Sequence, residues 1–266
     1  MYDFEYHRPS TVSEAVELLR GLDEPKLLAG GMSLLPALKH RLARPEALID
    51  LSHVEGLRGI TLVDDALTLG AMTPHVEVAR SEIVRSALPA LASLAGGIAD
   101  TQVRYRGTVG GSIANNDPSA DYPAACLALD AVIHTDRRAI AAGEFFSGLF
   151  STSLESDEIV TSVTFRPAEA AAYVKFRSVA SGYATVGVFV SKGARGTRVA
   201  VTGAGIEGVF RVREMEKRLD GQWHPDAIEM VQVPSRELSG DMHASAEYRA
   251  HLITVLARRA VSLCSS

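Results

Sequence analysis

Two glycine-pair stretches decide the fold: Lys26-Leu27-Leu28-Ala29-Gly30-Gly31-Met32-Ser33-Leu34 and Arg106-Gly107-Thr108-Val109-Gly110-Gly111-Ser112-Ile113-Ala114-Asn115. In each, apolar residues lead into paired glycines and then a hydroxyl side chain. Glycine has no Cβ, so its backbone N–H can approach a ligand closely. Successive inward N–H groups form a concavity that binds anions such as phosphate. Two such loops could hold the two phosphates of one dinucleotide from opposite sides.

The same residues also fit a plainer interpretation. A glycine pair is commonly a turn or a helix cap. Neither stretch has the lysine of a P-loop, and neither follows the G-x-G-x-x-G dinucleotide pattern. From the residues alone, turn and phosphate loop both remain open.

Composition excludes several classes of protein. The chain has 266 residues, 47% of them apolar, which is enough for one large domain or two moderate ones. A formal net charge of −5 argues against a nucleic-acid partner. Apolar runs stay well short of the roughly 20 residues of a membrane span. The polar, acidic start is unlike a secretory signal, so we expect a cytoplasmic protein without a membrane span.

The cysteines and histidines do not form a recognisable metal site. Cys126 and Cys264 lie far apart in apolar contexts, and two cysteines cannot hold an iron–sulfur cluster. The eight histidines are scattered, without a zinc-binding spacing. We therefore predict no metal ligands and no catalytic side chains.

Hydrophobic periodicity and capping signals outline the first 167 residues. Thr11-Val12-Ser13-Glu14 has the spacing of a capping box and predicts a helix ending at Gly21. Together with strands at 26–29 and 47–51 and a helix from Leu34 to Leu42, this indicates a small β-α-β unit. The later expected elements are a hairpin turning at 63–66, helices from Thr73-Pro74, over 83–95 and from Asp117-Pro118, and strands at 131–134 and 159–165.

A shift in composition follows near residue 168. Residues 168–172 read as a linker. Beyond it we expect three antiparallel strands, at 173–179, 184–191 and 198–204, and helices at 212–219, 225–230 and 244–261. The predicted domains are therefore 1–167 and 168–266.

Taken in order, these motifs resemble the FAD-binding medium subunit of molybdenum hydroxylases, the family of carbon monoxide dehydrogenase-like and xanthine dehydrogenase-like enzymes. Ala29–Ser33 is similar to the family's first FAD loop and Thr108–Ser112 to its second. Residues 102–107 precede the second loop as in the family, and 241–249 resemble its C-terminal helix entry. The resemblance covers nearly the whole chain.

The resemblance implies a fold and a cofactor. The fold is α+β (α/β): a two-subdomain FAD-binding fold of the vanillyl-alcohol-oxidase/PCMH type, with subdomains of about 1–54 and 55–167. A small domain with a three-stranded antiparallel sheet and helices follows. The implied cofactor is FAD, held non-covalently because no histidine or cysteine is placed to bind the flavin.

Site residues carried over from the family divide along the cofactor. The residues implied to contact the pyrophosphate and the adjoining ribityl region are Lys26, Leu27, Leu28, Ala29, Gly30, Gly31, Met32, Ser33 and Leu34. Those implied to contact the pyrophosphate from the other side are Thr108, Gly110, Gly111, Ser112 and Asn115. Asp121 is implied at the adenosine end. Ile98 and, similarly, Ile159 would line the cofactor near the isoalloxazine ring. Lys175 would place a cation beside the flavin and stabilise its anionic reduced form.

Two residues depart from the family pattern. Met32 stands where a polar residue is common, so one side-chain hydrogen bond to the cofactor would be missing. Tyr105 stands where asparagine is frequent. Neither change removes a backbone donor.

The function implied is that of an electron-transfer subunit in a molybdenum hydroxylase. A large subunit would carry the molybdenum cofactor and a small one [2Fe-2S] clusters, in a dimer of heterotrimers. Electrons would pass from those clusters through FAD to an external acceptor. Two alternatives stay open: a self-sufficient flavin oxidoreductase of the same fold, and a non-catalytic nucleotide-binding module.

Overall fold

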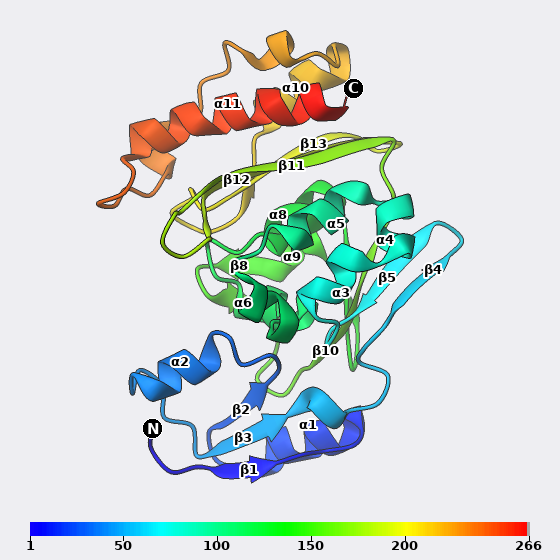
Figure 1. Ribbon diagram of the computed structural model, residues 1–266, viewed down its shortest axis with the longest axis vertical. Helices are drawn as coiled ribbons and strands as arrows, with labels where there is room; N and C mark the ends of the chain where they lie inside the picture. The colour runs from blue at the N-terminus through cyan, green and yellow to red at the C-terminus, as the bar shows by residue number, and fades with distance from the viewer. Residues whose placement is uncertain (265–266) are drawn as a thin grey trace.

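The computed structural model describes residues 1–264, and the chain begins with a small parallel sheet (Figure 1). Its strand order is β1-β3-β2. The elements are β1 (Glu5–His7), α1 (Val12–Gly21), β2 (Pro25–Leu28), α2 (Leu34–Lys39) and β3 (Ala47–Asp50), followed by the 3-10 turn η1 (Leu51–His53). The predicted β-α-β unit is confirmed, with β1 as an added strand.

Local signals at this end act as the sequence indicates, with one difference. Thr11 caps α1 by accepting from the Glu14 N–H, while the Glu14 carboxylate accepts from the Ser10 N–H at 2.8 Å. The helix after the first glycine pair ends at Lys39 rather than at Leu42. It ends early because Arg41 adopts a left-handed φ of 58°.

A five-stranded antiparallel sheet follows, in the order β4-β5-β10-β6-β7. Its strands are β4 (Ile60–Val63), β5 (Ala66–Gly70), β6 (Val132–Thr135), β7 (Ala139–Ala141) and β10 (Val160–Phe165). The predicted hairpin turn is confirmed: Asp64 and Asp65, with φ of 47° and 62°, form the left-handed turn that suits a two-residue connection.

Helices α3 to α9 cluster beside this sheet. They are α3 (His75–Arg80), α4 (Glu82–Ala87), α5 (Pro89–Gly96), α6 (Thr101–Arg106), α7 (Val109–Asn115), α8 (Tyr122–Ala128) and α9 (Ala142–Phe145), with the short hairpin β8 (Phe146–Gly148) and β9 (Ser151–Thr152) after α9. Two predictions here are wrong. The single helix over 83–95 is split at Leu88, because a proline disfavours helical geometry in the residue before it. The helix expected at Pro118 begins at Tyr122, since Asp117 instead closes a turn by accepting from the Ser119 N–H at 2.8 Å.

The C-terminal part is an antiparallel sheet in the order β11-β12-β13-β14, with α10 and α11 on one side and α5 and α8 of the central part on the other (Figure 1). Its elements are β11 (Ala170–Arg177), β12 (Ala184–Gly193), β13 (Gly196–Thr202), β14 (Phe210–Arg211), α10 (Arg213–Gly221), the 3-10 turns η2 (Pro225–Ile228) and η3 (Ser235–Glu237), and α11 (Ala246–Cys264). The sheet has four strands, so the prediction of three strands missed β14. The missing strand has two residues, too few to show a period-2 pattern.

The C-terminal motif at 241–249 is structural. Arg249 is buried, and its guanidinium donates to the carbonyls of Thr185 and Gly203 and to the Asp241 carboxylate. A buried cation must be paired and fully hydrogen-bonded. This arginine therefore fastens the start of α11 to the sheet beneath it.

Three apolar clusters form the core. One lies in the N-terminal unit, and one unites the central sheet with helices α3 to α5 and α7 to α9. The third joins the C-terminal sheet to α10 and α11. Phe189 and Ala200 project from the other face of that sheet into the central cluster. The boundary near residue 168 remains our proposal, and the two sides of it pack closely.

Candidate functional site

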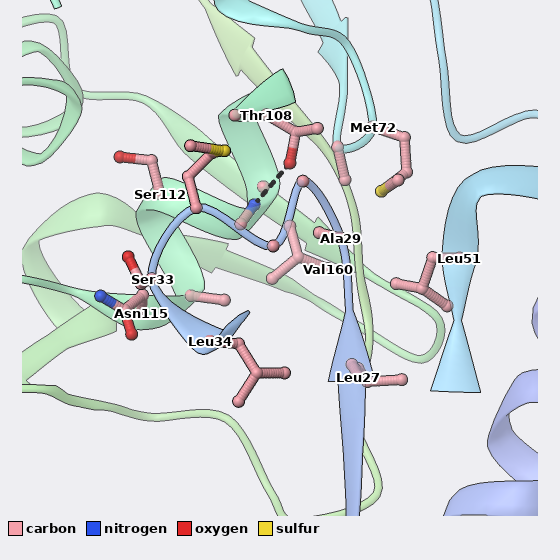
Figure 2. A pocket seen from close by; sticks show the side chains of 18 of the residues that line it. Leu27, Ala29, Ser33, Leu34, Leu51, Met72, Thr108, Ser112, Asn115 and Val160 are labelled. Carbon is pink, nitrogen blue, oxygen red and sulfur yellow. Dashed lines mark hydrogen bonds between the residues drawn. The ribbon is translucent and has the colours of Figure 1, made fainter. Parts of the chain in front are cut away.

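The two glycine stretches meet at a cavity of about 500 Å³. Figure 2 shows Ala29, Ser33 and Leu34 of the first stretch beside Thr108, Ser112 and Asn115 of the second. All the predicted site residues line the cavity except Leu28 and Lys175. The predicted residues make up about half of those that line the cavity.

The first loop has the geometry expected of a phosphate loop. It joins β2 to α2, and Gly31 takes a left-handed φ of 74°. A Cβ on Gly30 would lie 2.1 Å from the Arg106 carbonyl oxygen, so only glycine allows the two loops to touch. The backbone N–H groups of residues 30–33 donate to no other residue of the described chain. They are therefore available to an anion in the cavity.

The second loop differs from the predicted concavity. Its glycines lie in the first turn of α7, where Gly110 N–H donates to the Ala71 carbonyl at 2.8 Å. Gly111 N–H donates to the Thr108 hydroxyl, the dashed bond in Figure 2, and Ser112 N–H to the Thr108 carbonyl. With these amides engaged, the groups left for a ligand are the Thr108 N–H and the side chains of Thr108, Ser112 and Asn115.

The cavity has an apolar end and a polar end. Leu27, Leu51, Met72 and Val160 line the apolar end (Figure 2), and Ile159 packs there in the N-terminal cluster. Ile98, Ala99, Asp117, Asp121 and Tyr183 line the polar end. Ile98 packs against the central cluster, so the two isoleucines reach the cavity from different parts of the core.

Asp121 and Lys175 form a buried ion pair at the polar end. Lys175 Nζ lies 3.0 Å from both carboxylate oxygens and donates to the Gly182 carbonyl at 3.1 Å, while the Tyr173 hydroxyl also donates to Asp121. The two charged side chains are only 3% and 9% exposed. Burial raises the pKa of Asp121, and Lys175 and Tyr173 oppose that shift. The resemblance placed these residues at different ends of FAD, whereas their contact puts them at one end.

Sequence reasoning missed several residues of the cavity wall, and two of them, His75 and Tyr183, carry polar chemistry. His75 is buried beside the second loop. Its backbone N–H donates to the Gly107 carbonyl at 3.0 Å, whereas Nδ1 of its ring has no partner among the described residues. Burial, with a smaller effect of Arg104, lowers the pKa of His75 to about 4. Tyr183 reaches in from the loop between β11 and β12, and its hydroxyl interacts with Ser33. A lone histidine and a tyrosine in a Gly/Ser-rich turn give no sequence signal.

The two departures from the family pattern have different positions. Met32 lines the cavity. Tyr105 is 51% exposed, and its hydroxyl accepts from Arg80 at 3.1 Å on the surface of α6. Only the first change touches the site.

The residues present fit a dinucleotide such as FAD. The volume lies within the usual range for cofactor pockets. Unpaired amides suit a pyrophosphate, flanking apolar side chains suit an aromatic ring, and three polar side chains face them. Residues 1–264 hold no group of three side chains placed to bind a metal ion. Within the same residues, no helix is long and apolar enough to cross a membrane.

Comparison with known proteins agrees with this geometry. Residues 2–167 match the family described as the FAD binding domain in molybdopterin dehydrogenase. The chain is 35% identical to the carbon monoxide dehydrogenase medium chain of Hydrogenophaga pseudoflava, over 97% of this chain and 96% of that one. It is 36% identical to the nicotine 6-hydroxylase medium subunit of Paenarthrobacter nicotinovorans, over 96% and 95%.

A solved structure extends the similarity to the whole fold. It is that of carbon monoxide dehydrogenase from Hydrogenophaga pseudoflava lacking the Mo-pyranopterin moiety of the molybdenum cofactor, and it superposes with a TM-score of 0.88 at 34% identity, covering 99% of this chain and 98% of that chain. The resemblance stated from the sequence is confirmed. The chain belongs to the family of FAD-binding domains of molybdopterin dehydrogenases.

Proposed function

We propose that this chain is the FAD-binding electron-transfer subunit of a molybdenum-containing hydroxylase or dehydrogenase. The observation that carries the proposal is the run of unpaired amides at residues 30–33, which faces the second loop across the cavity. The chemistry that bound FAD supplies is electron transfer, from iron–sulfur clusters of a partner subunit to an external acceptor. The protein contributes position, shielding and electrostatics.

The cavity supports one placement of the cofactor. The pyrophosphate would lie on the amides of Gly30–Ser33, with the Thr108 and Ser112 hydroxyls opposite. The adenine would fill the apolar end, where Leu51 and Met72 offer flat contact. The isoalloxazine ring would then lie at the polar end, near Ile98, Asp121 and Tyr183. In this placement Asp121 serves the flavin and not the adenosine.

The Asp121–Lys175 pair changes what Lys175 can do. A cation neutralised at 3.0 Å by a carboxylate is a weaker source of positive potential than a free one. Its role would be to hold the β11–β12 loop, through the Gly182 carbonyl, beside the flavin end. The stabilisation of reduced flavin would then depend more on backbone donors.

The partners follow from the division of cofactors. We propose a large subunit with the molybdenum cofactor and a small subunit with [2Fe-2S] clusters, assembled as a dimer of heterotrimers in the cytoplasm. The cysteines of this chain do not suit a cluster: Cys126 is fully buried, and burial raises the pKa of its thiol. The relatives compared above are named for different substrates, carbon monoxide and nicotine, which fits substrate chemistry in another subunit.

The test is purification of the native protein under conditions that preserve complexes. We expect about one FAD per chain in the acid-soluble fraction. Molybdenum, iron, one larger partner chain and one smaller partner chain should be present in the same preparation. FAD bound to a chain that stays alone and reduces a small molecule would favour the self-sufficient oxidoreductase. A chain that neither carries nor takes up FAD would refute the assignment of FAD as its cofactor. The remaining hypothesis would then be a non-catalytic nucleotide-binding module.

A further inference from the structure

The turn between α5 and α6 carries backbone strain at the flavin end of the cavity. Ala99 has a left-handed φ of 40°, and both Ile98 and Ala99 line the cavity. Residues with a Cβ avoid this conformation unless their surroundings enforce it. Contacts with surrounding residues must therefore stabilise this conformation of Ala99.

Two arginines from distant parts of the chain hold it. Arg104 on α6 donates to the Ile98 carbonyl at 2.7 Å and to the Ala99 carbonyl at 3.1 Å. Arg177, at the end of β11 in the C-terminal part, donates to the same Ala99 carbonyl at 3.0 Å. The turn is thus fixed by both sides of the proposed domain boundary.

The bond from Arg104 to the Ile98 carbonyl orients the N–H of Ala99, and the bonds to the Ala99 carbonyl fix the following peptide group. All peptide bonds of residues 1–264 are trans, so the N–H of Ala99 points opposite to the carbonyl of Ile98. That carbonyl faces Arg104, and the Ala99 N–H donates to no residue of the described chain. A buried N–H without a partner is uncommon in proteins. This one belongs to a residue of the cavity wall that is 8% exposed.

We propose that Arg104 and Arg177 are positioning residues that hold the Ala99 N–H as a hydrogen-bond donor to the bound cofactor. The inference rests on the proposed function, because the acceptor would be an atom of the flavin ring system. A donor fixed there stabilises the ring more when reduction adds electron density. The arginines themselves need not touch the cofactor.

The β11–β12 loop completes this arrangement. Gly182 lies so close that a Cβ on it would be 2.9 Å from the Ala99 Cα and 3.0 Å from an Arg177 nitrogen. Its neighbour Tyr183 lines the cavity. The loop, the strained turn and Arg177 therefore form one contact at the flavin end.

The test compares the affinities of the protein for oxidised and reduced FAD. In the FAD-loaded complex, Arg177→Gln and Arg104→Gln should lower the ratio of reduced to oxidised affinity about tenfold. For a two-electron couple, this makes the midpoint potential of the flavin about 30 mV more negative. Arg177→Lys should restore much of the ratio, because one ammonium can replace the single hydrogen bond that Arg177 makes.

A matched control separates positioning from general stability. Arg85 also donates to a backbone carbonyl, that of Ala79 at 3.1 Å, but does not line the cavity. Arg85→Gln should leave the potential unchanged. If Arg104→Gln fails to fold, exposed Arg177 carries the test alone.

The outcomes separate the two proposals. Variants that bind FAD with a ratio within twofold of the parent, whatever their thermal stability, overturn the positioning role and leave the proposed function intact. A parent protein that binds no FAD in any state overturns both.

Discussion

Breaking the buried Asp121–Lys175 pair should destabilise the chain strongly, and the size of the effect follows from its burial. The pair is at most 9% exposed, with both carboxylate oxygens 3.0 Å from Nζ. Removing one partner of such a pair leaves an uncompensated charge in the interior. Lys175→Met should therefore lower the free energy of unfolding by about 3–5 kcal/mol at pH 7.

The double variant is the informative control. Lys175→Met with Asp121→Asn removes both charges of the pair and keeps an acceptor for the Tyr173 hydroxyl. It should cost much less than the sum of the single changes, because the two sites share one interaction. The free energies come from urea unfolding of the parent, both single variants and the double variant at pH 7.

The pH dependence gives the sign of the charge effect. Burial raises the pKa of Asp121, and losing Lys175 should raise it further. A carboxyl with a raised folded pKa takes up a proton in the folded state first, so the Lys175→Met protein should regain stability as pH falls through that folded pKa. A single-variant cost below about 1 kcal/mol, as for an exposed pair, would refute the reasoning. Fully additive costs would refute it equally.

Three further perturbations test other parts of the site. Gly30→Ala puts a Cβ 2.1 Å from the Arg106 carbonyl oxygen, so calorimetric titration should show FAD affinity at least about tenfold weaker, and an unchanged affinity would count against the loop contact. Asn115→Ala should weaken FAD by about 0.5–1.5 kcal/mol, whereas Tyr105→Phe, off the cavity, should not; equal effects would contradict the assignment. Burial lowers the pKa of His75 to about 4, from 6.5 in the unfolded chain. Between pH 6.5 and pH 4 the unfolded chain therefore binds the proton more readily, and the free energy of unfolding decreases by about 3 kcal/mol as the pH is lowered. His75→Phe should remove that part of the loss in urea unfolding at pH 6.5 and 4, and an unaltered pH dependence would exclude it.

Local signals carried most of the fold prediction. The capping residue Thr11, the hairpin turn at Asp64–Asp65 and the strand leading into Gly30 all act within a few residues, and the sequence shows them directly. The split at Leu88 was also readable, because Pro89 follows it. Periodicity outweighed the proline in our interpretation, and that was the error.

The site depended on contacts that no local pattern encodes. Lys175 and Asp121 are 54 residues apart, so their contact arises only when the C-terminal sheet packs against α8. The amides of Gly110 and Gly111 are engaged by Ala71 and Thr108, which turned an expected concavity into a helix start. The resemblance named about half of the residues that line the cavity, and packing decides which of their atoms remain free.

Hydrogen exchange of backbone amides shows which amides bound FAD engages. We propose that the pyrophosphate of FAD lies on the free amides of residues 30–33, while those of Gly110, Gly111 and Ser112 are already bonded. Adding FAD to the protein should therefore slow exchange markedly at residues 30–33 and change it little at 110–112. Slowing confined to the second loop, or none at either loop, would contradict the account.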